Sequence, residues 1–332
     1  MTKRLAEVAK KAGVSEATVS RVLNGRSGVS EATRASVLTA LDVLGYERPT
    51  KLRGERGRLV GLVLPELQNP IFPALAEVVT ASLAQRGFTP LLAARTIGGV
   101  PERDYIEMLL DHQVSGVVFA GGSYALAEAE HGHYRALTDR RMPVVMVNAG
   151  VADLGFPHIS TDDAVAVEQA YGHLRSLGHE RIGMVMGPED HVPSRRKLAA
   201  LEGKDFAVER TNFSMESARL AAAKLIERGV TGMICASDVL ALGSIRAARR
   251  LGLDVPSDIS VVGFDDSALM TCTDPPLTTV RQPIEMMGQA AVDLLVNQIE
   301  GSGVEPDELL FEPELVVRGS TAPAPQKASQ RG

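Results

Sequence analysis

Short apolar runs that alternate with longer amphipathic segments fill the chain from residue 59 onward. Each run is rich in Val, Ile, Leu or Met and is bounded by Gly, Pro or a helical pattern. The runs are LVGLVLP, TPLLAA, SGVVFAG, PVVMVNA, RIGMVMG, TGMICAS and ISVVGFDD. Nearly continuous apolar strands between amphipathic helices are typical of parallel sheets that are covered on both faces. Because the units lack the regular closure of a barrel, the pattern predicts an α/β body of two doubly wound parallel-sheet lobes.

The segments that follow these runs point to a binding site. Ligands of open parallel sheets bind outside the carboxyl ends of the strands. We therefore expect a cleft that is lined by ELQNPIF, GGS, NAG, STDD, GPEDHVPSRRK, SDV and FDDSALM. A small-molecule site of this kind combines an apolar wall with a few polar anchors.

Residues 1–46 carry a different pattern, that of three short amphipathic helices. Gly13 ends the first helix, and Ser15 and Ser30 are suited to cap the second and the third. The apolar positions at helical spacing are Leu5, Val8, Ala9, Ala12, Val19, Val22, Leu23, Val37, Leu38, Leu41 and Leu44. Two helices joined by a short turn with glycine form a helix-turn-helix, whose second helix lies in the major groove of DNA. The third helix completes a core that two short helices cannot make.

Charge is distributed unevenly along the chain. Residues 1–58 contain 12 Lys and Arg against 6 Asp and Glu, whereas the remainder contains 23 against 35. A small basic unit on a larger acidic body is typical of a protein that binds a polyanion at one end. Charge alone favours the simpler interpretation, a solvated basic face, and it is the helix-turn-helix pattern that favours DNA.

The stretch LAEVAKKAGVSEATVSRVLNGRSGVSEATRASVLTALDVLGY resembles, over more than 40 residues, the DNA-binding headpiece of the lactose-repressor (LacI/GalR) family of bacterial transcription regulators. The resemblance implies that Glu16, Ala17 and Arg21 read bases, with Arg21 suited to guanine O6 and N7. Glu16 either accepts a hydrogen bond from a cytosine amino group or disfavours other operators. The residues implied to contact phosphates are Ser15, Thr18, Ser20 and Asn24. The alternative for Ser15 is a helix cap alone.

The basic segment ERPTKLRGERGR, residues 47–58, is expected to be a linker. In the family that it resembles, this segment forms a short hinge helix on DNA and inserts an apolar residue into the minor groove. Leu52 is the candidate for that insertion. The segment is shorter than usual for the family, so the alternative is that its basic residues follow the phosphates without forming a helix.

The family resemblance extends over most of the body, through GLVLPELQNPIFPAL, SGVVFAG, LGHERIGMVMGP, ASDVLALGSIRAARRLGLDVPSDISVVGFDD and PPLTTVRQP. It implies a periplasmic-binding-protein-like effector domain in which the chain crosses between the lobes three times. The expected lobes are residues 59–158 with 281–311, nearer the DNA, and residues 159–280 with 312–320. Residues 321–332 are expected to form a disordered tail.

The resemblance also assigns candidate effector contacts. By position they are Asn69, Phe72, Asn148, Arg195, Lys197, Phe213, Ser237 and Asp265. Lys197 stands where many family members have arginine, and the neighbouring Arg195 and Arg196 are suited to compensate. The aromatic rings are suited to stack on a sugar face, and the polar side chains to bond its hydroxyl groups. The alternatives are a helix cap for Asp265 and a core position for Phe72.

Four segments, YERPTKLR, PELQNPIFPALA, HVPSRRK and TCTDPPLTTVRQP, most resemble the maltose- and maltodextrin-responsive repressors of this family. The resemblance implies a homodimeric, sugar-responsive repressor that binds a roughly palindromic double-stranded operator. Binding of the effector between the lobes is expected to change the affinity for DNA. No leucine heptad precedes the tail, which favours a dimer over a tetramer.

Other classes of function lack support in the sequence. Because no nucleophile elbow, Walker A loop or HExxH pair is present, we predict neither an enzyme nor a cofactor or metal site. No apolar stretch is long enough for a membrane helix and the N-terminus lacks a signal-peptide core, so we expect a cytoplasmic, nucleoid-associated protein without membrane contacts. The remaining alternative is a solute-binding protein, which the missing signal peptide and the basic headpiece disfavour.

Overall fold

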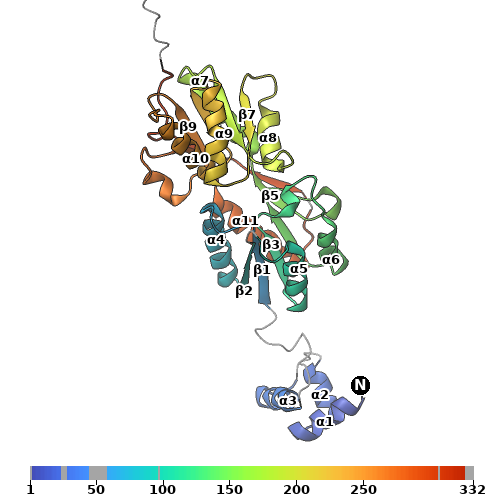
Figure 1. Cartoon of the computed structure of the whole chain (residues 1–332). Coiled ribbons are helices and arrows are strands. Elements are labelled where there is room, and N and C mark those ends of the chain that lie inside the picture. The colour runs from blue at the N-terminus through green and yellow to red at the C-terminus, as the bar shows by residue number, and fades with distance from the viewer. Residues whose placement is uncertain (1, 24–27, 45–57, 96–97, 306, 326–332) are drawn as a thin grey trace, which may run out of the picture. The chain divides into compact units, whose positions relative to one another are not determined.

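The computed structural model describes residues 2–23, 28–44, 58–95, 98–305 and 307–325. The chain divides into two compact units, a helical headpiece within residues 1–59 and an α/β body that contains nearly all the rest (Figure 1). Two predicted DNA contacts, Asn24 and Leu52, lie outside the described residues. The linker from residue 47 to 57 and its expected hinge helix also lie outside them.

The headpiece consists of three helices, as the apolar spacing predicted. They are α1 (Thr2–Ala12), α2 (Glu16–Leu23) and α3 (Glu31–Val43). The backbone amide of Thr18 donates to Ser15 Oγ and that of Thr33 to Ser30 Oγ, both at 3.2 Å, so both predicted serines cap their helices. The buried core is made of Val8, Ala9, Val19, Val22, Val37, Ala40 and Leu41. The other apolar residues predicted for this core pack around it and are half-buried.

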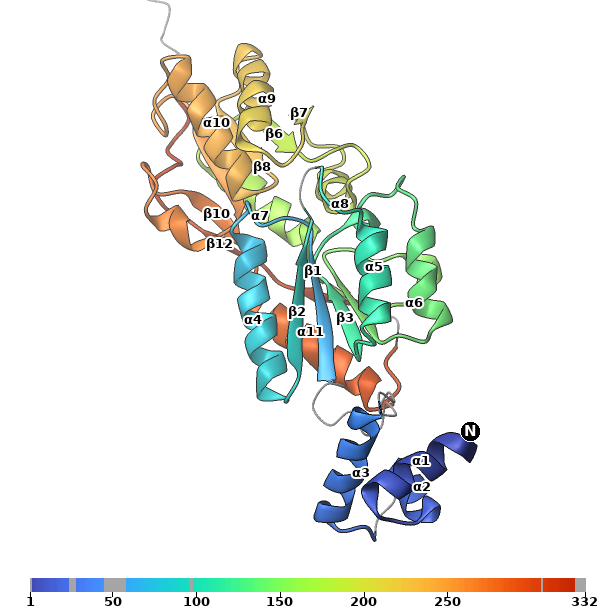
Figure 2. The same ribbon diagram turned by 60° about the horizontal axis from the view of Figure 1, so that its bottom comes forward.

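The first lobe of the body is a six-stranded, mainly parallel sheet with helices on both faces (Figure 2). Its strands lie in the order β11-β5-β4-β3-β1-β2. In chain order its elements are β1 (Leu59–Leu64), α4 (Ile71–Gln85), β2 (Thr89–Ala94), α5 (Glu102–Asp111), β3 (Gly116–Phe119), α6 (Arg135–Asp139), β4 (Val144–Val147), β5 (His158–Thr161), α11 (Ile284–Ile299) and β11 (Glu308–Phe311). Helices α4 and α11 pack together on one face, and α5 covers the other, where Leu109 contacts Gly61.

The second lobe repeats this architecture. Its strands lie in the order β12-β10-β9-β8-β6-β7, and they are parallel except for β12, which is antiparallel to β10. In chain order its elements are α7 (Asp163–Ser176), β6 (Ile182–Met186), α8 (Val192–Ala200), β7 (Ala207–Arg210), α9 (Met215–Glu227), β8 (Gly232–Cys235), α10 (Asp238–Arg250), β9 (Ser260–Asp265), β10 (Thr278–Arg281) and β12 (Glu314–Val316). The prediction of two doubly wound lobes is therefore confirmed.

The strands that connect the lobes differ from the predicted ones. All seven apolar runs form strands, but β5 and β10 read HIST and TTVR and have no apolar run to reveal them. The lobe boundaries expected after residues 158 and 280 fall inside these two strands. Strand pairing moves the boundaries to Thr161 and Arg281, because β5 pairs with β4 and β11 whereas β10 pairs with β9 and β12.

The beginning of the expected tail is bound to the second lobe. The backbone amide of Ala322 donates to Ser260 Oγ at 3.0 Å, and its carbonyl oxygen lies 3.0 Å from His179 Nε2. The amide of Ala324 donates to a carbonyl at the end of α7 at 2.8 Å. The prediction of disorder from residue 321 onward is therefore wrong for these residues, because backbone bonds hold them in spite of their polar and Pro-rich composition. Residues 326–332 lie outside the described part of the chain.

Candidate functional site

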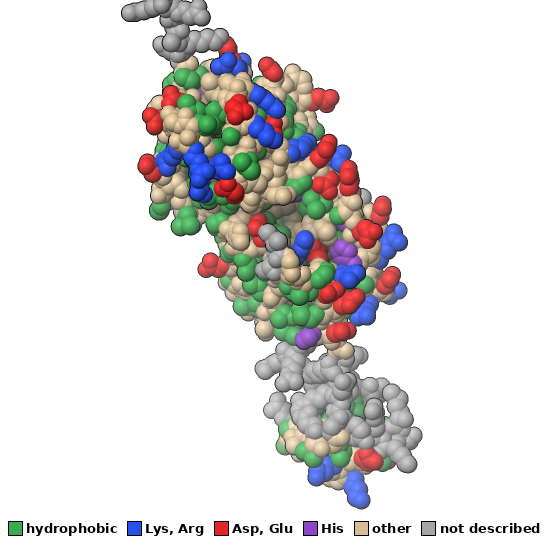
Figure 3. Space-filling view, viewed as in Figure 1, with side chains coloured by type: hydrophobic (Ala, Val, Ile, Leu, Met, Phe, Trp, Pro, Cys, Tyr) green, Lys and Arg blue, Asp and Glu red, His purple; other side chains and the backbone are tan. Residues whose placement is uncertain are grey.

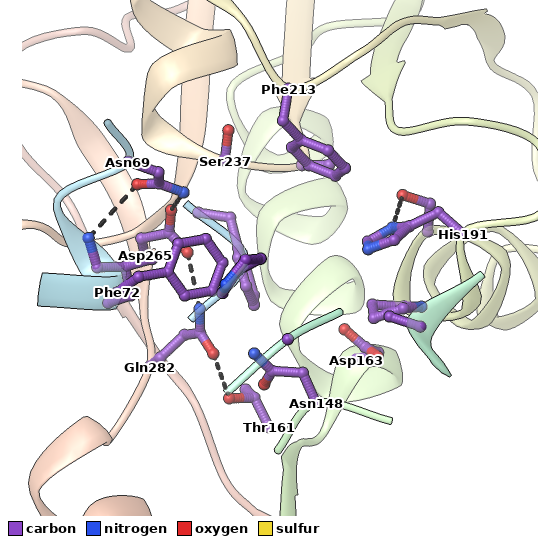
Figure 4. Close-up of a pocket in the computed structure, with 18 of the residues that line it drawn as sticks. Asn69, Phe72, Asn148, Thr161, Asp163, His191, Phe213, Ser237, Asp265 and Gln282 are labelled. Atoms are coloured by element: carbon purple, nitrogen blue, oxygen red, sulfur yellow. Dashed lines mark hydrogen bonds between the residues drawn. The ribbon is translucent and has the colours of Figure 1, made fainter. Parts of the chain in front are cut away.

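A cavity of about 290 Å³ lies where the carboxyl ends of the strands of the two lobes face each other (Figure 4). Its walls come from the segments that follow β1, β3, β4, β6, β7 and β8 and from the end of β9, together with Thr161 and Gln282 where the chain passes between the lobes. The lining predicted from the rule for open parallel sheets is thus present. The volume is near the lower end of the range of ~300–1,000 Å³ that is usual for small-molecule sites.

Seven of the eight residues predicted to contact an effector line this cavity. They are Asn69, Phe72, Asn148, Lys197, Phe213, Ser237 and Asp265. Arg195 does not line it and is exposed on α8, because two positions along a helix differ by about 200° and Lys197 is turned inward. Arg196 is bound to Glu308 of β11. Neither arginine therefore compensates for Lys197 in this structure, and effector binding by the other seven stays a prediction.

Asp265, the last residue of β9, is the centre of a buried hydrogen-bond network. Its carboxylate accepts from Asn69 Nδ2 at 3.2 Å and from Gln282 Nε2 at 2.7 Å, and Gln282 Oε1 accepts from Thr161 Oγ1 at 2.9 Å (dashed lines in Figure 4). Burial, followed by the negative charge of Asp238, raises the pKa of Asp265. Asp265 bonds these amides and does not cap a helix, which was the alternative. Because Asn69 follows β1 and Asp265 ends β9, the network joins the two lobes.

Two cavity residues have a backbone conformation that is uncommon for residues with a Cβ atom. The φ angle is +73° at Asn148 and +126° at Asp265. The backbone amide of Asn148 donates to the carbonyl of Ile159 at 2.7 Å, which holds this turn in place. Strained residues of this kind cluster at ligand sites, where the surrounding structure holds them. The strain therefore supports a binding role for the cavity.

The charge of Lys197 is already neutralised within the protein. Its ammonium pairs with the carboxylate of Asp163, the first residue of α7, and both side chains are buried. The same ammonium lies 3.9 Å from the centre of the Phe264 ring. Burial raises the pKa of Asp163 in spite of the nearby Lys197. Lys197 therefore borders the cavity as half of an ion pair and is not a free cation that awaits an anionic group.

Aromatic rings form part of the apolar wall, together with Pro, Ala, Ile and Leu side chains. Phe72 on α4 and Phe213, which precedes α9, belong to different lobes, and both are half-buried, so Phe72 is a wall residue and does not have the core position that was its alternative. The His191 ring packs edge-on against Phe213 at 4.8 Å between ring centres, and its Nδ1 lies 2.9 Å from Ser194 Oγ. Burial, and next the charge of Lys197, lowers the pKa of His191 to about 3. His191 is therefore neutral near pH 7.

Sequence reasoning missed several polar residues of the wall. They are Glu66, Thr161, Asp163, His191, Ser194 and Gln282. All but Gln282 lie in the segments ELQNPIF, STDD and GPEDHVPSRRK, which were expected to line the cleft, so their place in the chain was an available signal. Ser237 was predicted as an effector contact, and its Oγ also caps α10 by accepting from the amide of Leu240 at 3.2 Å. That capping bond leaves the hydroxyl hydrogen of Ser237 available to a ligand.

The second candidate site is the outer face of α2. Glu16, Ala17 and Arg21 are exposed, while Val19 and Val22 on the other side of the helix are buried in the headpiece core. The residues implied to contact phosphates, Ser15, Thr18 and Ser20, are exposed or half-buried along the same helix. Ser15 does cap the helix, and its Oγ also lies 2.9 Å from Thr18 Oγ1. The arrangement presents these side chains to a partner, and their contacts with DNA stay predictions.

Two family models and many known proteins match the chain. Residues 4–49 match the bacterial regulatory proteins of the lacI family, and residues 171–321 match a periplasmic binding protein-like domain. The chain is 51% identical to the transcriptional regulator MalR of Streptomyces coelicolor, with 98% of each sequence covered. The chain belongs to the LacI family. This LacI-family regulator is also 31% identical to the transcriptional repressor CytR of Escherichia coli, with 96% of each covered.

Solved structures of the LacI family agree with this fold. A complex of the transcriptional regulator CelR with cellobiose matches with a TM-score of 0.69 and 32% identity, over 95% of this chain and 99% of that one. The Lac repressor dimer bound to operator and an anti-inducer matches with a TM-score of 0.70 and 28% identity, over 95% and 98%. The protein is therefore a DNA-binding transcriptional regulator and not an enzyme, as the sequence predicted. The headpiece match also rules out the alternative of a simple solute-binding protein.

Proposed function

We propose that this regulator is a sugar-responsive repressor that binds a palindromic operator as a homodimer and controls genes for the use of maltose or maltodextrin. Relatives at 51% identity include MalR of Streptomyces coelicolor, and the similar CelR structure holds cellobiose. Three phenylalanine side chains and several uncharged polar groups line the cavity, a combination that suits the face and the hydroxyl groups of a sugar.

The observation that carries the proposal is the hydrogen-bond network across the cavity. Asn69 of the first lobe donates to Asp265 of the second, so a ligand that enters the cavity contacts both lobes and the bonds between them. A ligand shifts a conformational equilibrium only if it binds one state better than the other. A sugar that completes or replaces this network has that property, because its hydroxyl groups bond to side chains whose separation depends on how the lobes are arranged.

The DNA half of the proposal rests on α2 and on symmetry. In a two-fold dimer, two reading helices meet successive major grooves, which requires a roughly palindromic double-stranded operator. We place the lobe with β1 nearer the DNA, and Asn24 and the basic linker with Leu52 on the duplex. A repressor of this kind works where the chromosome is, in the cytoplasm and associated with the nucleoid. Among the described residues, no helix is both long and apolar enough to cross a membrane.

The proposal is tested by measuring DNA binding and sugar binding on the full chain. Fluorescence anisotropy with duplexes from upstream of maltose-utilisation genes should detect one roughly palindromic site. Addition of maltose, maltotriose or cellobiose should change the affinity for that site by roughly 5- to 150-fold, the usual range of allosteric coupling. Specific DNA binding that no sugar changes would contradict the sensor role, and the absence of any specific site would contradict the repressor role.

A further inference from the structure

The charged side chains around the cavity fall into two groups. Five of the lining residues are ionisable, namely Glu66, Asp163, His191, Lys197 and Asp265. Four of them are accounted for within the protein: Lys197 pairs with Asp163, Asp265 accepts from two amides, and His191 is neutral. Glu66 is the one residue of these five that such contacts do not account for.

Glu66 lies two residues after the end of β1 and is half-buried at the cavity wall. Within the described part of the chain, its carboxylate has neither a hydrogen bond nor an ion pair. Burial alone raises the pKa of Glu66, since no neighbouring group lowers it. A half-buried carboxylate that has lost part of its hydration and has no bonding partner in the described protein is free to accept hydrogen bonds from a ligand.

We propose that Glu66 sets the charge class of the effector: it accepts hydrogen bonds from hydroxyl groups of a neutral sugar and excludes phosphorylated and acidic sugars. This inference rests on the proposed sensor function and adds to it the ligand class and the residue that selects it. An ionised carboxylate accepts hydrogen bonds at both oxygens and donates none, so it bonds hydroxyl groups and repels phosphate.

The positions of the Lys and Arg side chains in the second lobe also favour a neutral sugar as the effector. Arg and Lys side chains make the strongest bonds to a phosphate, and Lys197, the one Lys or Arg among the described lining residues, is held by Asp163. The lobe does carry a group of exposed arginines, Arg246, Arg249 and Arg250, but they lie on α10 at the outer surface, where Figure 3 shows basic side chains gathered. A phosphosugar in the cavity would therefore meet Glu66 without a compensating cation.

The test is calorimetric titration of the full-length protein and of Glu66→Gln with maltose and cellobiose, each compared with its 6-phosphate. The unmodified protein should bind at least one neutral sugar at least 10-fold more tightly than its phosphate. Loss of a hydrogen bond to a charged group should weaken binding of that sugar to Glu66→Gln by roughly 10- to 100-fold. Binding of the phosphate should improve, so the ratio of the two affinities should narrow.

The matched control is Glu107→Gln, which removes the same charge from an exposed position on α5 and should change neither affinity. Because an unpaired charge is removed, Glu66→Gln without ligand should melt at the same temperature as the unmodified protein or above it. A lower melting temperature, or an unchanged affinity ratio, would contradict the role of Glu66. If the unmodified protein binds no sugar at all, the sensor function itself is wrong. Sugar binding that Glu66→Gln leaves intact contradicts only the present inference.

Discussion

The reading helix and the cavity place their candidate functional side chains in opposite environments. Arg21 on α2 is exposed and, in the part of the chain that the structure describes, has no hydrogen bond or ion pair. Asp265 and Lys197 at the cavity are buried, and other residues of the body hold both. Exposed, unbonded side chains are replaced at little cost to stability, whereas removal of one member of a buried pair is costly. DNA recognition should therefore be separable from folding, whereas substitution of the buried and bonded cavity residues Lys197 and Asp265 should disturb folding as well as effector recognition.

The largest effect should come from Lys197→Met. This change leaves the carboxylate of Asp163 buried without its partner, which should lower the free energy of unfolding by about 3–5 kcal/mol. Urea unfolding followed by circular dichroism measures that loss. A decrease below about 1 kcal/mol would show that the cavity tolerates substitution as well as α2 does, and the contrast between the two regions would fail.

The double variant Lys197→Met with Asp163→Asn is the control. It removes both charges, so no unpaired ion remains in the interior, and much of the lost stability should return. If the double variant is as unstable as Lys197→Met alone, packing of the long lysine side chain against Phe264 is the cause and the ion pair is not.

The pH dependence of stability should show how strongly the cavity wall buries His191. The pKa of this residue is about 3 in the folded protein, against 6.5 for a free histidine, because burial and next Lys197 disfavour its charged form. The unfolded chain therefore binds a proton below pH 6.5 that the folded chain does not bind. The stability that depends on His191 is complete above pH 6.5 and is lost as the pH falls toward 3.

The expected slope below pH 6.5 is at most about 1.4 kcal/mol per pH unit, or about 2 kcal/mol by pH 5. Unfolding by urea at a series of pH values should show this slope in the unmodified protein and a shallower one in His191→Gln. Parallel curves for the two proteins would mean that His191 is accessible to water and that the cavity wall is not as closed as its contacts indicate.

Arg21→Ala tests the other region in this comparison, the exposed face of α2. Loss of a bidentate contact with a base should weaken binding to the operator by about 1–3 kcal/mol, while the free energy of unfolding changes by less than about 0.5 kcal/mol. Lys11→Ala is the control, because it removes one exposed positive charge from α1. If Arg21→Ala weakens binding to specific and to non-specific DNA to the same extent, as the loss of a phosphate contact would, Arg21 does not read bases.

The difference between the headpiece and the cavity also explains which features could be predicted from the sequence. The headpiece core and its caps Ser15 and Ser30 follow from spacings of three and four residues, so local periodicity predicted them. The apolar strands were equally visible. Strand β10 was not, because Thr279 on it is buried by bonding to Asp238, which lies 41 residues away in sequence.

The cavity itself was only partly predictable. The rule for parallel sheets named the segments that line it, and the family resemblance named most of the side chains. Neither revealed that Lys197 is paired with Asp163, 34 residues earlier in the chain, or that Arg195 faces away. Such facts depend on which helices the fold brings together, and no local pattern contains that information.

The smallest effect should come from an ion pair of intermediate exposure. Arg196 of α8 donates to both carboxylate oxygens of Glu308 on β11, at 2.6 and 3.2 Å, and thereby links the two lobes outside the cavity. Both side chains are partly accessible, so water screens the pair and Glu308→Gln should cost about 1 kcal/mol, well below the limit of about 3 kcal/mol that the lowered pKa of Glu308 would allow without screening. A double-mutant cycle with Arg196→Gln measures the coupling.

The pH dependence of this ion pair has the direction expected when folding lowers the pKa of a carboxylate. Burial would raise the pKa of Glu308, but its bonds to His158 and Arg196 outweigh burial and lower the pKa from 4.5 to about 2. The contribution of Glu308 to stability is therefore present above pH 4.5 and is lost as the pH falls toward 2, so the difference from Glu308→Gln should shrink over that interval. If Glu308→Gln lowers the free energy of unfolding as much as Lys197→Met does, the connection between the lobes, rather than burial, decides how much a charged contact stabilises this body.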